Sequence, residues 1–138
     1  MPDLGSTYMT MLWLSVILGL VHVAIAATAA VAKRGQAWGF GPRDETPAPL
    51  GRLGARLERA WKNFLETFPL FLGAVVVLGS TNGNVDLAGI GAMLYFWARL
   101  AYLPVYAIGI PFVRTLVWTV SLAGIVVILV ACVPGVGA

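Results

Sequence analysis

Four long segments of the chain are mainly apolar, and shorter polar segments separate them. These segments cover about residues 8–32, 53–79, 87–103 and 112–133. A helix that crosses a membrane needs about 20 mainly apolar residues. The pattern therefore predicts an all-α membrane protein, a bundle of four transmembrane helices that forms one domain over residues 1–138.

Glycine and proline mark the breaks between the apolar segments. Residues 33–52 contain seven of them, which is expected to exclude a regular helix from this loop. A short polar turn after Gly79 leads to the third segment, and Pro104, Gly109 and Pro111 are expected to mark the next break. Pro111 also suits the first turn of the fourth helix, where no N–H group is needed.

The first apolar segment has a competing interpretation as a cleaved signal peptide. Small residues at positions 24–29 resemble cleavage sites. However, residues 1–3 include no lysine or arginine, and the apolar segment is longer than the core of a signal peptide. We therefore expect a retained transmembrane helix.

The distribution of charge predicts the orientation in the membrane. Every lysine and arginine lies within residues 33–62 or 99–114, and such residues concentrate on the cytoplasmic side of membrane proteins. Both segments are therefore expected to face the cytoplasm. Both chain termini, together with Asp3 and Asp86, are expected to face outward.

Composition excludes several classes of protein. Charged residues make up 11% of the chain, whereas a soluble domain typically has about 25%. The net charge of +3 does not indicate nucleic-acid binding, because the basic residues flank apolar segments and no soluble domain presents them. Cys132 is the only cysteine, so the chain has no intrachain disulfide, and we expect no metal site.

Polar residues gather at the inner ends of three apolar segments, where such groups are costly and are usually retained for function. On the second helix the spacing i, i+4, i+7 places three of them on one face. The three groups are Arg59, Asn63 and Glu66 on the second helix, Arg99, Tyr102 and Tyr106 on the third, and Arg114 with Trp118 on the fourth.

These residue types suit a small ligand that carries carboxylates and an amine. The forked donors of arginine match carboxylates, and Glu66 would accept an ammonium group. Asn63 and the tyrosine hydroxyls can complete the hydrogen bonds. A tripeptide with two carboxylates and one amine would use all of these groups. The same groups can instead serve only to hold helices together, and the residues alone leave both readings open.

Three further polar or aromatic features have simpler interpretations. His22, in the middle of the first helix, is expected to form a hydrogen bond that packs helices together, with a proton relay as the alternative. Glu58 and Lys62 are expected to form an exposed ion pair that contributes little. Trp118 is expected to serve in packing or as an anchor at the membrane interface.

A longer motif on the second helix resembles a known family. Residues 59–72 read RAWKNFLETFPLFL, which resembles the R-A-x-x-N-x-x-E-x-x-P signature of the MAPEG family, the membrane-associated proteins in eicosanoid and glutathione metabolism. Residues 98–106, 109–111 and 114–115 look like the third and fourth helices of bacterial members. With the glycine-rich first loop, the resemblance covers nearly the whole chain.

The resemblance implies a homotrimer in the bacterial inner membrane, with glutathione as co-substrate between neighbouring subunits at the cytoplasmic face. The implied activity is a glutathione-dependent transferase or peroxidase that acts on lipophilic electrophiles, and the implied partners are glutathione, this lipophilic substrate and membrane lipid. By motif match, Arg114 and Thr115 are the expected catalytic residues, with Arg114 stabilising the thiolate. The expected glutathione ligands are Arg34, Arg59, Asn63, Glu66, Arg99, Tyr102 and Tyr106.

The chain departs from the family pattern at Trp118, where some animal members have a tyrosine one turn after the catalytic arginine. A glutathione-binding or structural membrane protein without turnover is therefore a second hypothesis. A small drug exporter is a third. Exporters of that kind need a carboxylate early in the membrane-embedded chain, but the first apolar segment has none and Glu66 lies among arginines that repel cationic drugs.

Overall fold

A computed structural model describes residues 6–136, and every regular element in that range is a helix. The helices are α1 (Thr7–Arg34), α2 (Gln36–Phe40), α3 (Gly51–Gly79), α4 (Val85–Ile108) and α5 (Pro111–Ala131). All except the short α2 are long and apolar enough to cross a membrane. The predicted four-helix, all-α membrane fold is confirmed. Asp3 and the two chain termini, which we expected to face outward, lie outside the described residues.

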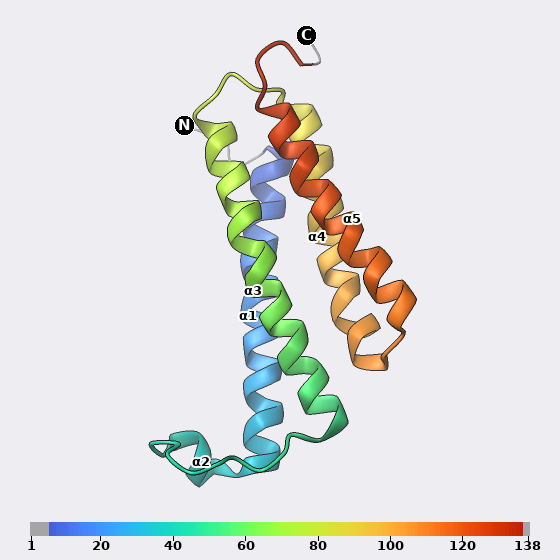
Figure 1. The fold of residues 1–138 in the computed structure, drawn as a ribbon. Helices are drawn as coiled ribbons and strands as arrows, with labels where there is room; N and C mark the ends of the chain where they lie inside the picture. Colours follow the sequence, from blue (N-terminus) through green and yellow to red (C-terminus); the bar gives the residue numbers. More distant parts are fainter. Residues whose placement is uncertain (1–5, 137–138) are drawn as a thin grey trace.

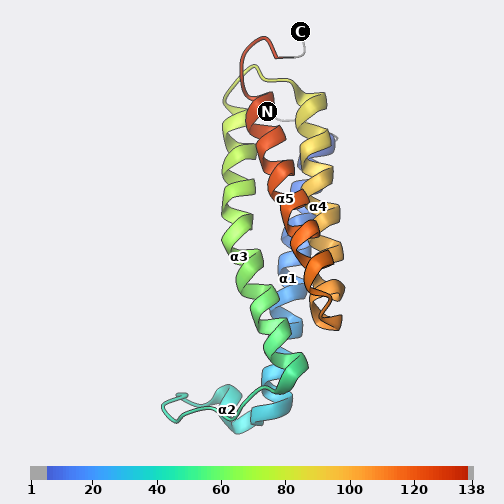
Figure 2. The same cartoon turned by 45° about the vertical axis from the view of Figure 1, so that its right-hand side comes forward.

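The four long helices run side by side as a bundle (Figure 1). α4 packs most extensively against α5 and also contacts α1 and α3. In both views α1 and α3 extend beyond the turn between α4 and α5, and α2 lies at that far end (Figures 1 and 2). The bundle therefore has one end where α1 begins and α5 ends, and an opposite end that carries α2 and the α4–α5 turn.

Two glycines bring the backbones of α4 and α5 together. A Cβ atom on Gly124 would lie 2.5 Å from the carbonyl oxygen of Gly91, and one on Gly91 would lie 2.6 Å from the carbonyl oxygen of Gly124. A side chain at either position would force the helices apart. Small residues are the usual means of close helix packing within a membrane.

The core between α3 and α4 combines an aromatic stack with one buried polar contact. The rings of Phe71 and Tyr95 stack with centroids 4.1 Å apart. The Tyr95 hydroxyl shares a hydrogen bond of 3.2 Å with Oγ1 of Thr67. Ile128 of α5 and Tyr8 of α1 belong to the same apolar cluster. A polar contact inside an apolar interior favours one register of α3 against α4.

The expected break at Pro104 is wrong, because α4 continues through it to Ile108. The helix ends instead before Gly109, whose φ of 86° lies in the left-handed region that glycine adopts readily. Arg56 of α3 donates hydrogen bonds of 3.1 Å to the carbonyls of Ala107 and Ile108. This contact satisfies carbonyls that have no partner inside the helix. Residues on both sides of Pro104 therefore keep one helical face.

The loop between α1 and α3 also differs from expectation. The glycines and prolines of residues 33–52 do not exclude a helix, because the five residues of α2 fit between the breaks at Gly35 and Gly41. One helical turn needs only a few consecutive residues in helical geometry. This short helix places Trp38 beside the end of α1, as its contact with Arg34 shows.

Candidate functional site

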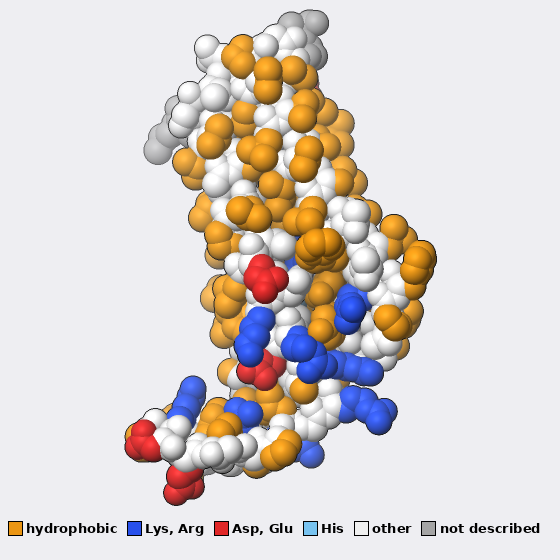
Figure 3. All heavy atoms as spheres, viewed as in Figure 1, with side chains coloured by type: hydrophobic (Ala, Val, Ile, Leu, Met, Phe, Trp, Pro, Cys, Tyr) orange, Lys and Arg blue, Asp and Glu red, His pale blue; other side chains and the backbone are white. Residues whose placement is uncertain are grey.

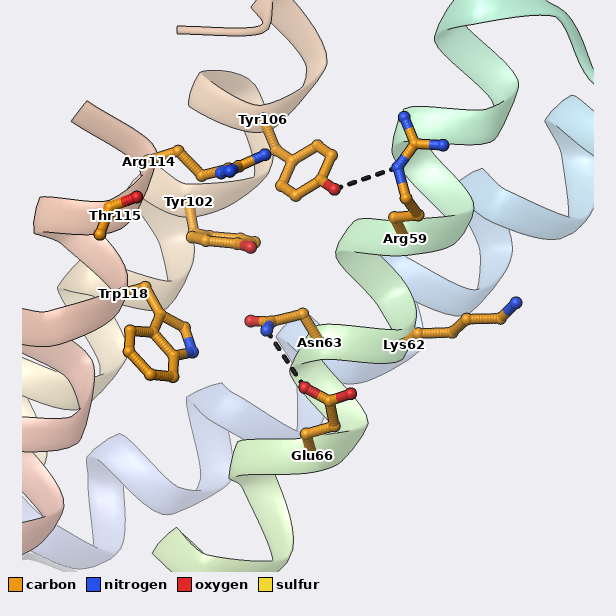
Figure 4. Close-up of a pocket in the computed structure, with 9 residues that line it drawn as sticks. All are labelled: Arg59, Lys62, Asn63, Glu66, Tyr102, Tyr106, Arg114, Thr115 and Trp118. Atoms are coloured by element: carbon orange, nitrogen blue, oxygen red, sulfur yellow. Dashed lines mark hydrogen bonds between the residues drawn. The ribbon is translucent and has the colours of Figure 1, made fainter. Parts of the chain in front are cut away.

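A cavity of about 520 Å³ lies between α3, α4 and α5. Side chains from the three helices point into one space (Figure 4). On the face shown in Figure 3, basic and acidic side chains gather on the half that carries α2 and the α4–α5 turn, and hydrophobic side chains predominate on the other half. The lining residues are Arg59, Lys62, Asn63, Glu66, Tyr102, Tyr106, Arg114, Thr115 and Trp118.

Tyr106 of α4 joins two cations across the cavity. Nε of Arg59 donates a hydrogen bond of 3.1 Å to the Tyr106 hydroxyl, and the guanidinium carbon of Arg114 lies 5.1 Å from the centroid of the Tyr106 ring. Within residues 6–136, neither arginine forms an ion pair with a carboxylate. Both positive charges are therefore available to an anionic ligand.

Asn63 links a buried cation to the carboxylate of the cavity. Nη1 of Arg99 donates to Oδ1 of Asn63 at 2.8 Å, and Nδ2 of Asn63 donates to Oε2 of Glu66 at 3.3 Å. The side chain of Arg99 is 0% exposed, and its guanidinium carbon lies 4.4 Å from the centroid of the Tyr102 ring. Because Oδ1 accepts from Arg99, the amide directs its NH₂ group toward Glu66.

The cavity combines positive charge with one carboxylate, one amide and two phenols. That set fits a small ligand with carboxylates and an ammonium group. Its volume lies within the range of about 300–1,000 Å³ that is usual for small-molecule sites. A guanidinium such as that of Arg114 lowers the pKa of a thiol bound beside it.

Comparison with known proteins identifies the family. The chain matches the MAPEG family over residues 11–134, a range that includes every residue lining the cavity. The chain belongs to the MAPEG family. No curated protein and no solved structure matches it. Membership supports, in general terms, an integral membrane protein with a role in glutathione or eicosanoid chemistry.

The MAPEG chain brings seven of the nine predicted site residues to one cavity. Arg99 lies behind the lining, where it contacts Asn63 rather than the open space. The roles of all nine as ligands or catalysts stay predictions. The seven that line the cavity are Arg59, Asn63, Glu66, Tyr102, Tyr106, Arg114 and Thr115.

Arg34, the ninth, lies outside this cavity. It ends α1, and its Nε donates a hydrogen bond of 2.9 Å to the carbonyl of Ala48. Its guanidinium carbon lies 4.5 Å from the centroid of the Trp38 ring. Within one chain, Arg34 therefore does not contribute to this cavity.

Two residues that line the cavity were not predicted as part of the site. Trp118 follows Arg114 by four residues, so helical spacing places both on one face, and its indole faces the cavity (Figure 4). Lys62 also lies at the rim, and its Nζ forms the predicted exposed ion pair with Oε1 of Glu58 at 3.3 Å. Helical spacing could have predicted both residues. Trp118 is four residues after Arg114, and Lys62 is three residues after Arg59 and four before Glu66.

The predicted hydrogen bond of His22 is wrong. The side chain is 1% exposed, and neither ring nitrogen has a hydrogen-bond partner among residues 6–136. The imidazole instead stacks on Phe64, with ring centroids 4.9 Å apart. The aromatic rings of Phe64 and Trp61 surround it without offering an acceptor.

This environment predicts the effect of His22→Leu on stability. An unpaired buried polar group costs about 1–3 kcal/mol, and leucine has a similar volume, so the free energy of unfolding should stay unchanged or rise by about 1 kcal/mol. Thermal unfolding in detergent measures the change, with His22→Phe as a control that keeps an aromatic ring against Phe64. A clear loss of stability in His22→Leu alone would contradict the stacked, unpaired arrangement.

Proposed function

We propose that this MAPEG protein is a glutathione-dependent membrane transferase or peroxidase that acts on lipophilic electrophiles. One observation carries the proposal: a single cavity, in a member of this family, gathers guanidinium, carboxylate, amide and phenol groups from three helices. Glutathione has two carboxylates, one ammonium and one thiol, which are the partners that these groups need.

The charges suggest how glutathione would lie. The ammonium would pair with Glu66, and a carboxylate would bind the guanidinium of Arg59, which has no carboxylate partner among the described residues. Asn63, oriented by Arg99, would bind a peptide group. In a homotrimer, Arg34 of a neighbouring subunit would supply a further cation. The phenols of Tyr102 and Tyr106 would complete the hydrogen bonds.

Arg114 is the residue best suited to activate the thiol. It lies in the first turns of α5, where the positive end of the helix dipole adds to the charge of its own side chain. The thiolate would attack an electrophilic carbon, so that an S–C bond forms and the leaving group departs with its electron pair. With a hydroperoxide, the thiolate would attack the terminal oxygen, so that an S–O bond forms, the O–O bond breaks, and the departing alkoxide takes up a proton to become an alcohol. The thiol of a second glutathione would then attack the resulting glutathione sulfenic acid, which forms glutathione disulfide and releases water.

The surroundings of the cavity support entry of the two substrates from different phases. Trp118 and the exposed Leu116 of α5 lie on an apolar helix that would face lipid. A lipophilic substrate would therefore reach Arg114 from the bilayer. The basic end of the bundle would face the cytoplasm of a bacterium, from which glutathione would enter.

One observation favours a second candidate, glutathione binding without turnover. Oγ1 of Thr115 donates a hydrogen bond of 3.2 Å to the carbonyl of Pro111, so this hydroxyl proton is engaged by the backbone of α5. Trp118 supplies no hydroxyl. Thiol activation would then depend on Arg114 and the two tyrosines alone.

The test is a titration of the purified protein in detergent with glutathione, followed by assays with an aryl halide and an organic hydroperoxide. We expect thiolate absorbance on binding, then conjugation or peroxide reduction. Binding without either reaction would favour the second candidate. Absence of both binding and thiolate would overturn the proposed function.

A further inference from the structure

The last turn of α4 is bound by a side chain from another helix. Pro104, near the start of this turn, has no N–H group, so the carbonyl four residues before it receives no hydrogen bond from position 104. Beyond this proline, Nη1 of Arg56 donates hydrogen bonds of 3.1 Å to the carbonyls of Ala107 and Ile108. Arg56 is half-buried, and it forms no ion pair within residues 6–136. The end of α4 is therefore held against α3 by a charged side chain, which also lies at the negative end of the α4 dipole.

Gly109 leaves room for this contact. A Cβ atom at position 109 would lie 2.5 Å from Cζ and 2.7 Å from Nη1 of Arg56. A side chain there would displace the guanidinium from the two carbonyls that it binds. The φ of Gly109 is 86°, which also favours glycine. The guanidinium thus occupies a space that exists only because residue 109 has no side chain.

The carbonyls that Arg56 binds directly follow a residue of the proposed glutathione site. Ala107 comes after Tyr106, which lies between Arg59 and Arg114 in the cavity (Figure 4). Arg114 lies in the first turns of α5, just beyond the turn that ends α4. Because α5 packs far more extensively against α4 than against α3, the position of Arg114 relative to α3 depends on how α4 is held.

We propose that Arg56 is a positioning residue for thiol activation: by holding the last turn of α4 against α3, it sets the distance of Tyr106 and Arg114 from the α3 side of the cavity. The inference rests on the proposed glutathione-dependent function. Arg56 does not line the cavity, so it acts through α4 and α5 rather than on the ligand. Without it, Arg114 would be less well placed beside the sulfur of a glutathione held by Arg59 and Glu66.

The first measurement tests the contact itself and needs no glutathione. Hydrogen exchange of the unliganded protein in detergent, read by mass spectrometry, reports on the backbone of residues 105–114. Arg56→Met keeps a long side chain but removes its donors and charge, so exchange there should become roughly tenfold faster, while exchange in α1 stays unchanged. Arg52→Ala removes a cation at the same end that makes neither hydrogen bond, and it should change neither segment. Unchanged exchange in Arg56→Met would overturn the proposal.

The second measurement follows the thiolate absorbance of bound glutathione as a function of pH. In Arg56→Met the pKa of the bound thiol should rise, so that the thiolate fraction at neutral pH falls roughly three- to tenfold. The KM for glutathione should change less than kcat, because the α3 ligands remain in place. A merely structural contact would lower thermal stability and leave this pKa where it is. Thiolate that persists unchanged in Arg56→Met would therefore overturn the positioning role and leave the proposed function standing.

Gly109→Ala separates the position of the guanidinium from its charge. This variant keeps every charged residue but places a Cβ atom where the guanidinium of Arg56 lies, so it should lower the thiolate fraction by a similar factor. Combining it with Arg56→Met should lower the fraction no further than Arg56→Met alone, because both substitutions remove the same contact. Additive losses, or full thiolate in Gly109→Ala, would show that Arg56 acts through its charge and would overturn the proposal.

Discussion

Arg114→Ala is expected to abolish the thiolate absorbance of bound glutathione and to lower kcat/KM by roughly 10²- to 10³-fold, as when one preorganised electrostatic contact is removed. The guanidinium lines the cavity and has no carboxylate partner within the described range. Alanine removes the one cation that α5 contributes to the lining. Binding of glutathione should weaken far less, because Arg59 and Glu66 remain.

Two further variants distinguish the effect of the Arg114 charge from a general disturbance of the structure. Arg114→Lys keeps a positive charge but loses the fork of donors, so part of the thiolate signal should survive. Arg52→Ala removes a cation at the same end of the bundle that does not line the cavity, and it should change neither quantity. Full thiolate absorbance in Arg114→Ala would exclude this residue from thiol activation.

Arg99→Leu is expected to weaken glutathione binding roughly 10- to 100-fold, although Arg99 does not line the cavity. The substitution removes the donor to Oδ1 of Asn63, so the amide is no longer held by α4 and can turn away from the orientation that it has in the cavity. The site would then lose the orientation of Asn63. Thermal stability should change less, because Nε and Nη2 of Arg99 have no partner among the described residues.

A double-mutant cycle distinguishes this positioning role from a structural one. Arg99 acts through Asn63, so combining Arg99→Leu with Asn63→Ala should weaken binding little more than Asn63→Ala alone. Calorimetric titration with glutathione measures each step of the cycle. Additive losses would show that Arg99 contributes by another route.

The fold and much of the cavity were predictable because the relevant signals are local in sequence. The length of the apolar segments predicted the four long helices. Helical spacing predicted the helix faces that carry Asn63, Tyr102 and Arg114. The residues at which the helices end were less predictable. Pro104 does not end α4, whose terminal carbonyls receive hydrogen bonds from Arg56, about 50 residues earlier in the chain.

Helical spacing could not predict how deeply a side chain is buried in the bundle or which residues of other helices it contacts. Arg99 lies on the expected face, but the packing around it decides that it sits behind Asn63 rather than in the cavity. His22 similarly meets an aromatic ring where a polar partner was expected. Arg34 was predicted only from the resemblance to the family, and within one chain it lies outside the cavity.

A structure of the protein in lipid with glutathione bound would decide whether the three helices build one glutathione site. We predict glutathione in the 520 Å³ cavity, with its ammonium at Glu66, contacts to Tyr102 and its sulfur beside Arg114. Glutathione bound elsewhere, or held by side chains of a single helix, would contradict this assignment.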